Sequence, residues 1–477
     1  MIVQARAGDA PAAPTAPLTV VARRAATPSR PGPERANSRR APGARSTASA
    51  LVAEGACIYP RLMLIRDARV LTLALPRGGR GPRRGHSLRE LSILPRGSVR
   101  IDGSRIIEVA DGWTEPRADE AVVEAEGRVL MPAFVDCHTH ACWAGQRLDE
   151  FEMRLAGATY LQILKAGGGI MSTVRAVRAA TEEQLAAGLV ERLLRMARLG
   201  TGTVEVKSGY GLSPEMELVM LRAIRSASRE TRQIVVPTFL GAHAIDPECP
   251  DFVERTINET LPAAVTEFPG IACDAFCEDG AWSLAETRRL FENARDMGCR
   301  LRVHTDQFNS LGMTRLAIEM GAATVDHLEA ITASDMQHLA RSETIAVLLP
   351  VSGFHLDDRY APARDLIDCG AAVAIATNCN PGSAPSPSMA FAIGLASRKL
   401  RMTPAEAIVA ATYNAACVLD LQDEVGSIET GKRADLQLLD LRDERELAYE
   451  IGGPPPALVV VGGEPVSPPT PGRPPLS

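Results

Sequence analysis

The stretch Met131-Pro-Ala-Phe-Val-Asp-Cys-His-Thr-His140 begins the pattern that decides the fold. It overlaps an apolar run containing β-branched residues, which is typical of a buried β-strand. Similar runs recur along the chain, with helical patterns between them. The eight predicted strands are Val129–Val135, Thr203–Val206, Ile234–Leu240, Ile271–Phe276, Arg300–Val303, Ala323–Val325, Ile345–Leu349 and Ala372–Ala376. Eight alternations of strand and helix favour an α/β fold of the TIM type, a closed parallel (β/α)₈ barrel.

Two of the segments between these strands carry a helix-start signal. Thr181-Glu-Glu-Gln184 and Ser283-Leu-Ala-Glu286 both have the capping-box form. In that motif, the hydroxyl and the side chain three positions later each bond the other residue's backbone N–H. An amphipathic stretch follows each motif, so we expect helices to begin there.

Further β structure is predicted on both sides of the barrel region. Short strands separated by turn residues are expected at 64–71, 97–101, 106–109, 121–125, 426–435, 436–441 and 458–461. We infer that the two flanks, 61–128 and 422–466, join in one composite β-sandwich domain. The barrel then spans 129–421.

Both ends of the chain are expected to be disordered. Residues 1–60 are rich in Ala, Pro, Arg and Ser and hold only three acidic residues, so they can bury little apolar surface. They lack the apolar core of a secretory signal. Their composition is that of a transit peptide, but a tail, or a misassigned start with Met63 as the true one, is favoured. Residues 467–477 are Pro-rich.

Composition limits the kinds of partner. The 477 residues carry a net charge of −6, which favours neither nucleic acid nor an anionic membrane as the main partner. No run of 18 apolar residues suggests a membrane span. A small-molecule substrate is favoured instead. The ten cysteines form no C-x-x-C pair and are expected to be free thiols of a cytoplasmic protein.

Five of the eight histidines stand where predicted strands end. His138 and His140 follow the first strand, and His243, His304 and His327 follow three others. In a (β/α)₈ barrel, the groups that do chemistry come from the C-terminal strand ends. The i, i+2 spacing of His138 and His140 places both imidazoles on one face of a strand. Together with His304 they suit Zn²⁺ or Fe²⁺, so the histidines predict a metal-dependent hydrolase.

Longer motifs are similar to those of the amidohydrolase superfamily. The stretch Met131–His140 resembles its first-strand signature, and Gly426-Ser-Ile-Glu-Thr-Gly-Lys-Arg-Ala-Asp435 resembles its C-terminal sheet segment. Within the superfamily, the chain resembles the imidazolonepropionase family over about 62–463. The stretches that carry this resemblance are Arg147–Tyr160, Ala166–Thr173, Glu205–Leu212, Thr238–His243, His304–Gln307 and Asn380–Gly382.

The resemblance implies an activity and a set of site residues. The activity is the hydrolytic opening of the ring of 4-imidazolone-5-propanoate to N-formimidoyl-L-glutamate, in histidine degradation. The implied cofactor is one Zn²⁺ or Fe²⁺/Fe³⁺ ion, and its implied ligands are His138, His140, His304 and Asn378. The implied substrate contacts are Arg147, Tyr210, His243, Gln307, Asn380, Gly382 and Ser383.

Physical chemistry agrees with several of these roles. Arg147 offers a planar fork that suits the carboxylate of the substrate, although an ion pair with Asp149 or Glu150 is the alternative. His243 and His327 suit proton transfer because of the usual pKa range of imidazole. Gln307, the third catalytic candidate, can hydrogen-bond the ring but cannot act as a carboxylate base.

The main departure from the family pattern is at position 378, with a milder one at Gln146, where the family often has aspartate. The family's fourth ligand is usually an aspartate, and this chain has Asn378, which is neutral and a poor base. Losing that carboxylate could cost several kcal/mol of transition-state stabilisation. Three interpretations stay open: His243 or His327 acts as the base, the site accepts a related ring, or the site is weakened.

Two other functions compete with the one that the resemblance implies. A different amidohydrolase, such as a nucleobase-type deaminase, would use the same histidines but would give Arg147 no carboxylate to hold. A non-enzymatic protein that binds a small ligand is the other alternative, and Asn378 is the only residue that suggests it. The metal's identity and the oligomeric state are not encoded in these patterns. A homodimer is the expectation from the habits of the fold.

Overall fold

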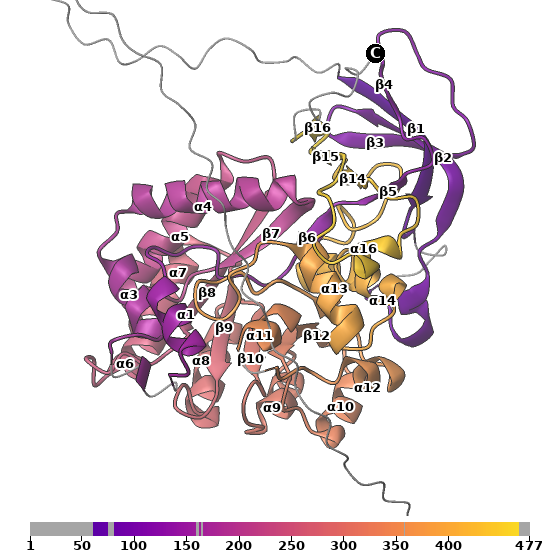
Figure 1. Ribbon diagram of the computed structural model, residues 1–477. Coiled ribbons are helices and arrows are strands. Elements are labelled where there is room, and N and C mark those ends of the chain that lie inside the picture. Colours follow the sequence, from indigo (N-terminus) through magenta and orange to yellow (C-terminus); the bar gives the residue numbers. More distant parts are fainter. Residues whose placement is uncertain (1–60, 75–80, 159–161, 164–165, 357, 467–477) are drawn as a thin grey trace, which may run out of the picture. The chain divides into compact units, whose positions relative to one another are not determined.

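The computed structural model describes residues 61–74, 81–158, 162–163, 166–356 and 358–466. The regions predicted to be disordered, 1–60 and 467–477, lie outside these residues, as does Tyr160. Within the described part, two eight-stranded sheets are present, and helices surround one of them (Figure 1).

The helix-surrounded sheet is the predicted barrel. Its strands are β6 (Phe134–Asp136), β7 (Thr201–Lys207), β8 (Ile234–Ala242), β9 (Ala272–Cys277), β10 (Leu301–Thr305), β11 (Thr324–His327), β12 (Ile345–Leu348) and β13 (Val373–Ile375). They pair in this order and are all parallel. Side chains fill the inside and helices cover the outside, so every residue of β7 is buried. The predicted barrel fold is confirmed.

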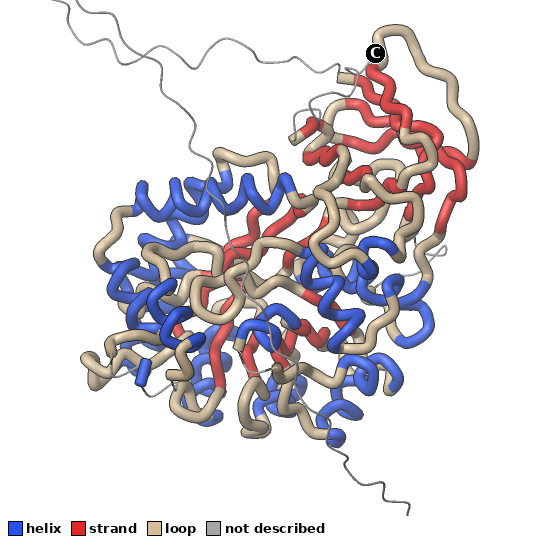
Figure 2. Tube along the Cα trace, in the orientation of Figure 1, coloured by secondary structure: helices blue, strands red, loops and turns tan. Residues whose placement is uncertain are grey.

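The helices follow the strands in alternation (Figure 2). Those before β10 are α1 (Leu148–Leu155), α3 (Ile170–Arg178), α4 (Glu182–Arg198), α5 (Pro214–Ser228), α6 (Phe252–Arg255), the π-helical turn η2 (Thr256–Thr260), α7 (Leu261–Glu267) and α8 (Leu284–Asp296). Those after β10 are α9 (Met313–Glu319), α10 (Ala333–Ala340), α11 (Pro350–His355), α12 (Ala363–Asp368), α13 (Met389–Lys399), α14 (Pro404–Ala410), α15 (Tyr413–Val418) and α16 (Glu446–Tyr449). Both predicted capping boxes are present, at Thr181 before α4 and at Ser283 before α8.

The second sheet combines both flanks of the barrel region, as predicted. Its strands are β1 (Leu62–Leu71), β2 (Ile93–Asp102), β3 (Arg105–Asp111), β4 (Ala121–Glu124), β5 (Val129–Pro132), β14 (Leu436–Leu438), β15 (Leu458–Val461) and β16 (Glu464–Pro465). They form one curled sheet around an apolar core of its own. A short 3₁₀ helix, η1 (Gly85–Arg89), precedes β2. Most of the predicted strand 426–435 is irregular instead.

The first predicted strand, Val129–Val135, is divided between the two sheets. Its first part, β5, pairs with β1 and β14 in the composite sheet, and its second part, β6, opens the barrel. Ala133 stands between them, and its N–H donates to Asp435 of the C-terminal flank. The composite sheet is therefore joined to the strand that carries the first two histidines with a single residue between.

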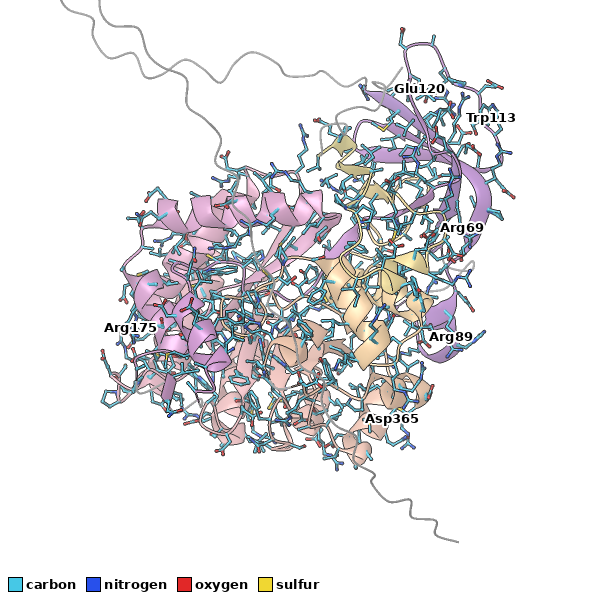
Figure 3. The ribbon with its side chains drawn as sticks, viewed as in Figure 1. Arg69, Arg89, Trp113, Glu120, Arg175 and Asp365 are labelled. Atoms are coloured by element: carbon cyan, nitrogen blue, oxygen red, sulfur yellow. The ribbon has the colours of Figure 1, made fainter. Side chains whose placement is uncertain are left out.

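Ion pairs between distant residues tie the N-terminal flank to the C-terminal flank and to the barrel. Arg69 of β1 pairs with Glu444 at 2.7 Å, and Arg89 of η1 pairs with Glu406 of α14 at 2.9 Å (both arginines are labelled in Figure 3). Among the described helices, none is both long and apolar enough to cross a lipid bilayer.

Polar side chains close the seam between the first and last barrel strands. Thr377, just after β13, donates its N–H and its hydroxyl to Asp136 of β6, at 3.0 and 2.5 Å. One residue further, the N–H of Asn378 donates to the carbonyl of His138 at 3.0 Å. The seam therefore places the end of β13 directly beside the histidine motif.

Candidate active site

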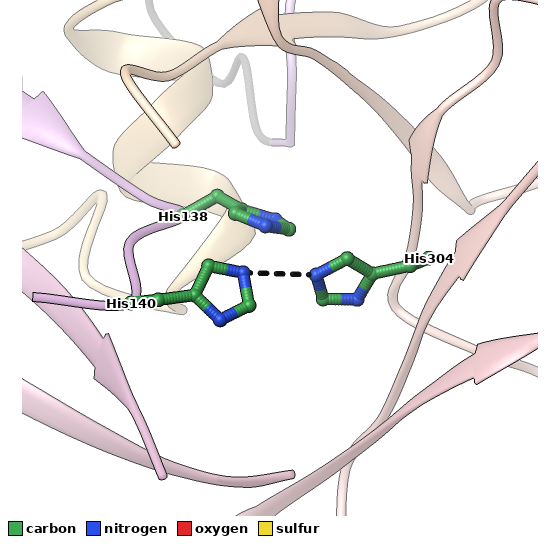
Figure 4. A group of neighbouring side chains, drawn as sticks. All are labelled: His138, His140 and His304. Atoms are coloured by element: carbon green, nitrogen blue, oxygen red, sulfur yellow. Dashed lines mark hydrogen bonds between the residues drawn. The ribbon is translucent and has the colours of Figure 1, made fainter. Parts of the chain in front are cut away.

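Three buried histidines converge at the carboxyl ends of the barrel strands. His138 and His140 follow β6, and His304 lies in β10 (Figure 4). One ring nitrogen from each lies within 4.8 Å of the others, and the Nε2 atoms of His140 and His304 are 3.2 Å apart. Three imidazole nitrogens at this spacing are a suitable ligand set for one metal ion.

Two of these rings are oriented from behind by carboxylates. His138 donates its Nδ1–H to Asp326 at 2.5 Å, and His304 donates its Nδ1–H to Asp274 at 3.1 Å. An ionised carboxylate only accepts hydrogen bonds, so it fixes the proton on Nδ1 and leaves the Nε2 lone pair toward the cluster.

Buried cations hold those carboxylates in turn. Arg302 donates to Asp326 at 3.0 Å, and Lys207 pairs with Asp274 at 2.8 Å. Lys207 also pairs with Glu205 at 2.7 Å. Its ammonium is thus enclosed between two carboxylates, which gives it a structural role instead of the ligand role of a modified lysine in a two-metal site.

The protonation of the trio fits a metal site. Burial, with the nearby positive charges, lowers the pKa of His138 and of His140 well below the usual value. Burial also lowers the pKa of His304, against the opposing effect of Asp274. The rings are therefore neutral at physiological pH, which is the form that binds metals.

Two buried polar atoms beside the seam also fit a cation. The Nε2 atom of His138 and the Oδ1 atom of Asn378 have no hydrogen-bond partner among the described residues. Leaving such atoms unpaired costs free energy, about 1–3 kcal/mol each. A metal ion would satisfy both, so the residues present fit the group that the family implies.

Asn378 is held in a defined orientation. Its backbone has a φ of 54°, in the left-handed region where asparagine is one of the tolerated residues. Its Nδ2 donates to the hydroxyl of Ser352 in α11 at 2.7 Å. The amide hydrogens are therefore turned toward α11, and the carbonyl oxygen is the atom left over.

His243 stacks against the trio. Its ring lies 4.7 Å from that of His140, and its Nδ1 donates to the carbonyl of Gly209 at 3.0 Å. Burial and the neighbouring His304 lower its pKa to about 3. A ring with that pKa is a weak proton acceptor, so His243 is better suited to hydrogen-bond a substrate in its neutral form.

His327 approaches the trio from β11, the strand next to that of His304. It is the last residue of β11, and its ring lies 5.6 Å from that of His304 and 6.2 Å from that of His138. Its Nδ1 lies 3.2 Å from Oε1 of Glu329, two residues further along the chain. Of the two candidate bases in the sequence, only His327 has a carboxylate partner.

The predicted carboxylate fork of Arg147 is already paired. Arg147 donates from Nε and Nη2 to Glu150, at 2.9 and 2.5 Å, and the carboxylate of Glu150 is buried. The same guanidinium lies against Gly382, where a β-carbon would collide with it. Arg147 is therefore held rigidly beside the loop after β13, and Nη1 is the remaining edge of its fork. Tyr210 is buried, and burial raises its pKa.

The predicted loop residues mainly build the loop itself. The Oδ1 of Asn380 accepts the N–H groups of Gly382 and Ser383, at 2.8 and 2.7 Å. Its Nδ2 donates to the carbonyl of Asn378 and to the hydroxyl of Ser383. Asn380 thus shapes a turn that places Gly382 under Arg147. Gln307 lies on the other side of the site, in a small pocket that Glu329 and Ser352 also line.

Sequence reasoning missed the groups behind the histidines. Asp274, Arg302 and Asp326 stand inside otherwise apolar strands, and Lys207 ends one. A charged residue within a predicted buried strand was the available signal, since it needs a partner there. Glu329 and Ser352 carry no such signal, because they follow strands in segments that look like ordinary loops.

The comparisons with known proteins agree with this architecture. The model of the amidohydrolase family matches residues 129–466. The chain therefore belongs to the amidohydrolase family. An imidazolonepropionase from Herpetosiphon aurantiacus is 43% identical over 403 residues, covering 81% of this chain and 93% of the relative. One from Rubrobacter xylanophilus is 44% identical over 409 residues, covering 84% and 97%. Within the amidohydrolases, the chain is a member of the imidazolonepropionase family that these relatives represent.

Solved structures share the fold at lower identity. An amidohydrolase from a Sargasso Sea environmental sample superposes with a TM-score of 0.60 at 21% identity, covering 85% of this chain and 93% of that one. A 5-methylcytosine deaminase from Klebsiella pneumoniae, liganded with 5-fluorocytosine, gives 0.65 at 17% identity, covering 85% and 97%. These similarities establish the fold alone.

Proposed function

We propose that this chain hydrolyses 4-imidazolone-5-propanoate to N-formimidoyl-L-glutamate. The observation that carries the proposal is the buried trio of His138, His140 and His304, which brings one ring nitrogen from each within 4.8 Å of the others, with His243 stacked on His140. The choice of substrate follows from the relatives named imidazolonepropionase, which are more than 40% identical to this chain. The reaction adds water to the ring carbonyl and breaks the adjacent C–N bond.

The metal of this site is held by the three histidines, with Asn378 as the fourth ligand through its amide oxygen. Zn²⁺ and Fe²⁺ both suit three imidazoles and one oxygen. When bound, such an ion acts as a Lewis acid and lowers the pKa of water. The protein contributes neutral rings and fixes their direction through Asp326 and Asp274.

The remaining roles follow from charge and position. Arg147, held by Glu150, presents its free edge to the propionate of the substrate. Neutral His243 and Gln307 hydrogen-bond the ring and leave it uncharged. His327 moves the proton, because its Nδ1 is committed to Glu329 and its Nε2 is left to accept. The nine described cysteines are unpaired, which supports a reducing compartment such as the cytoplasm.

The test is the decay of freshly generated imidazolonepropionate, followed by absorbance, with metal analysis of the same sample. A fast decay that a chelator abolishes is expected. Arg147→Ala is expected to raise KM by at least about tenfold, because a charge-assisted hydrogen bond from Nη1 is worth about 1.5–3 kcal/mol. Uncatalysed decay with a full complement of metal would overturn the proposal. Ammonia release from nucleobases, with KM insensitive to Arg147→Ala, would favour a deaminase.

A further inference from the structure

The mouth of the site carries two amides. Asn378 and Gln307 are both neutral, so neither can accept the proton of an attacking water. The buried carboxylates behind the trio are committed elsewhere. Asp274 lies between His304 and Lys207, and Asp326 accepts from both His138 and Arg302 on the Nδ1 side of the ring. The histidine that accepts the proton therefore needs a different carboxylate as its partner.

Glu329 has the burial and the spare oxygen that such a partner requires. Its side chain is 6% exposed, and Oε1 lies 3.2 Å from Nδ1 of His327. Its second oxygen, Oε2, is buried and has no hydrogen-bond partner among the described residues. Burying a carboxylate with one oxygen unpaired lowers the stability of the fold. Stability therefore does not explain why Glu329 is there.

A strained turn keeps Glu329 in place. His327 and Leu328 have φ values of 87° and 72°, which are unfavourable for residues with side chains, at about 1–3 kcal/mol each. The reversal brings Glu329 back beside the ring that precedes it. The turn is anchored to the end of β10, since Leu328 donates to the carbonyl of Thr305 at 3.2 Å and Ala330 to that of Asp306 at 2.6 Å.

The turn also places Glu329 near the two amides at the mouth. Its side chain lines the same small pocket as Gln307 and Ser352. Ser352 in turn accepts the amide hydrogen of Asn378. Glu329 and Gln307 therefore share one pocket, and Asn378 is linked to that pocket through Ser352.

We propose that Glu329 is the positioning carboxylate of the reaction and forms a dyad with His327. The inference rests on the proposed hydrolysis and names what replaces the acid missing at position 378. Glu329 keeps the proton of His327 on Nδ1, so that Nε2 is the acceptor. As the water oxygen bonds to the ring carbonyl carbon, its proton passes to Nε2 and Glu329 stabilises the imidazolium. The proton then goes to the ring nitrogen as the C–N bond breaks, and neutral His327 is restored.

The kinetic test compares E329Q with E329D. Loss of general-base catalysis lowers kcat about 10²–10⁴-fold, and KM is expected to change less than threefold because Glu329 does not bind the substrate. E329D keeps the charge and is expected to recover at least tenfold of that loss. E343Q, at a fully exposed acid, is the matched control and should equal the wild type. A kcat of E329Q within threefold of the wild type would overturn the dyad.

A second measurement does not depend on turnover. Nitrogen NMR of histidine-labelled, metal-free protein reports the tautomer of each ring, and H327Q assigns the signal of His327. The wild type is expected to show the Nδ1–H form, and E329Q a mixture of both forms. The same tautomer in both proteins would exclude the positioning role even if kcat fell. Should E329Q fail to fold, H327Q decides in its place, because a kcat of H327Q within threefold of the wild type would overturn the dyad.

The two proposals fail in different ways. A wild type without ring-opening activity removes the proposed function, while the tautomer measurement still decides whether the dyad exists. The double variant E329Q/N378D adds a cross-check in an active enzyme. If Glu329 supplies the charge that position 378 lacks, N378D should restore kcat at least tenfold in the E329Q background and change it less in the wild type.

Discussion

The two sides of the histidine trio hold charge in opposite ways. On the Nδ1 side, inside the barrel, Lys207 and Arg302 are locked between buried carboxylates at 2.7–3.4 Å. On the Nε2 side, at the mouth, the trio meets the amides of Asn378 and Gln307 and the neutral ring of His243. The difference shows a division of labour. Strong ion pairs fix the direction of the ligands where no reaction occurs, whereas the reacting side carries neutral groups apart from the Arg147–Glu150 pair and Glu329.

Removing a ring of the trio would break both sides at once. His304→Ala deletes an Nε2 donor at the mouth and leaves Asp274 without its histidine behind it. We expect the purified protein to lose its metal and kcat/KM to fall by about 10³-fold or more, equivalent to several kcal/mol. Metal analysis and the substrate decay assay measure this. His338→Ala, at an exposed histidine of α10, is the control and should retain both.

Breaking only the inner side tests whether the ion pairs serve geometry. Arg302→Met leaves Asp326 buried without its cation, while Glu205 keeps only its pair with Lys207. Breaking a buried pair of this kind costs about 3–5 kcal/mol of unfolding free energy, and losing support for a ligand lowers metal affinity about 10–100-fold. Denaturant unfolding and competition with a metal indicator provide the two values. Arg300 is exposed and lies two residues earlier, so Arg300→Met should leave the unfolding free energy and the metal affinity near wild type. A stable variant with unchanged metal affinity would contradict the division.

The neutral state of the mouth can be measured through pH. His243 has a pKa of about 3 in the folded protein against 6.5 when unperturbed. Between these values the unfolded chain binds a proton that the folded chain does not, so acidification favours unfolding. The contribution of His243 to the free energy of unfolding is fully present above pH 6.5. Below that pH it is lost at about 1.4 kcal/mol per pH unit.

A matched variant isolates that contribution. Between pH 7 and pH 5, metal-free wild type should lose about 2 kcal/mol more unfolding free energy than His243→Asn, which cannot titrate. Other titrating groups are common to both proteins and cancel in the difference. Parallel stability curves would mean that the folded protein holds His243 protonated, contrary to an uncharged mouth.

The smallest effect is expected far from the trio, in the composite sheet. Arg69 pairs with Glu444 across 375 positions of sequence, but Arg69 is partly exposed. Ion pairs near the surface contribute about 0–1 kcal/mol, so Arg69→Gln should lower Tm by only a few degrees and leave kcat unchanged. A double-mutant cycle with Glu444→Gln isolates the pair itself. A loss of kcat would show that the sheet acts on the site directly.

Much of the barrel could be predicted because its strands repeat one simple pattern. Each of the eight apolar runs overlaps a barrel strand, and the capping boxes at Thr181 and Ser283 start helices as expected. The boundary within Val129–Val135 could not be predicted. Both halves are equally apolar, and only pairing with β14, some 300 residues away, assigns the first half to the other sheet.

The candidate site was predictable where residues sit at strand ends and not where they act through partners. His138, His140, His243, His304 and His327 follow from position alone, and the structure brings them together. The pairing of Arg147 with Glu150 was foreseen only as an alternative to substrate binding. The partnership of His327 with Glu329 depends on two left-handed residues that no local pattern announces.

The junction between β5 and β6 has a consequence for how the molecule is made. β5 pairs with β1 on one side and with β14 on the other. β1 is synthesised before β5, whereas β14 is synthesised about 300 residues after it. Every histidine of the site is synthesised before β14 exists. The strand that leads into His138 therefore stays unpaired along one edge through most of synthesis, and the site reaches its final geometry only after the C-terminal flank has docked. Its activity thus reports on completed translation, because a chain stopped after Asn378 would contain every proposed ligand and still lack β14, the strand that pairs with β5 just ahead of the first two.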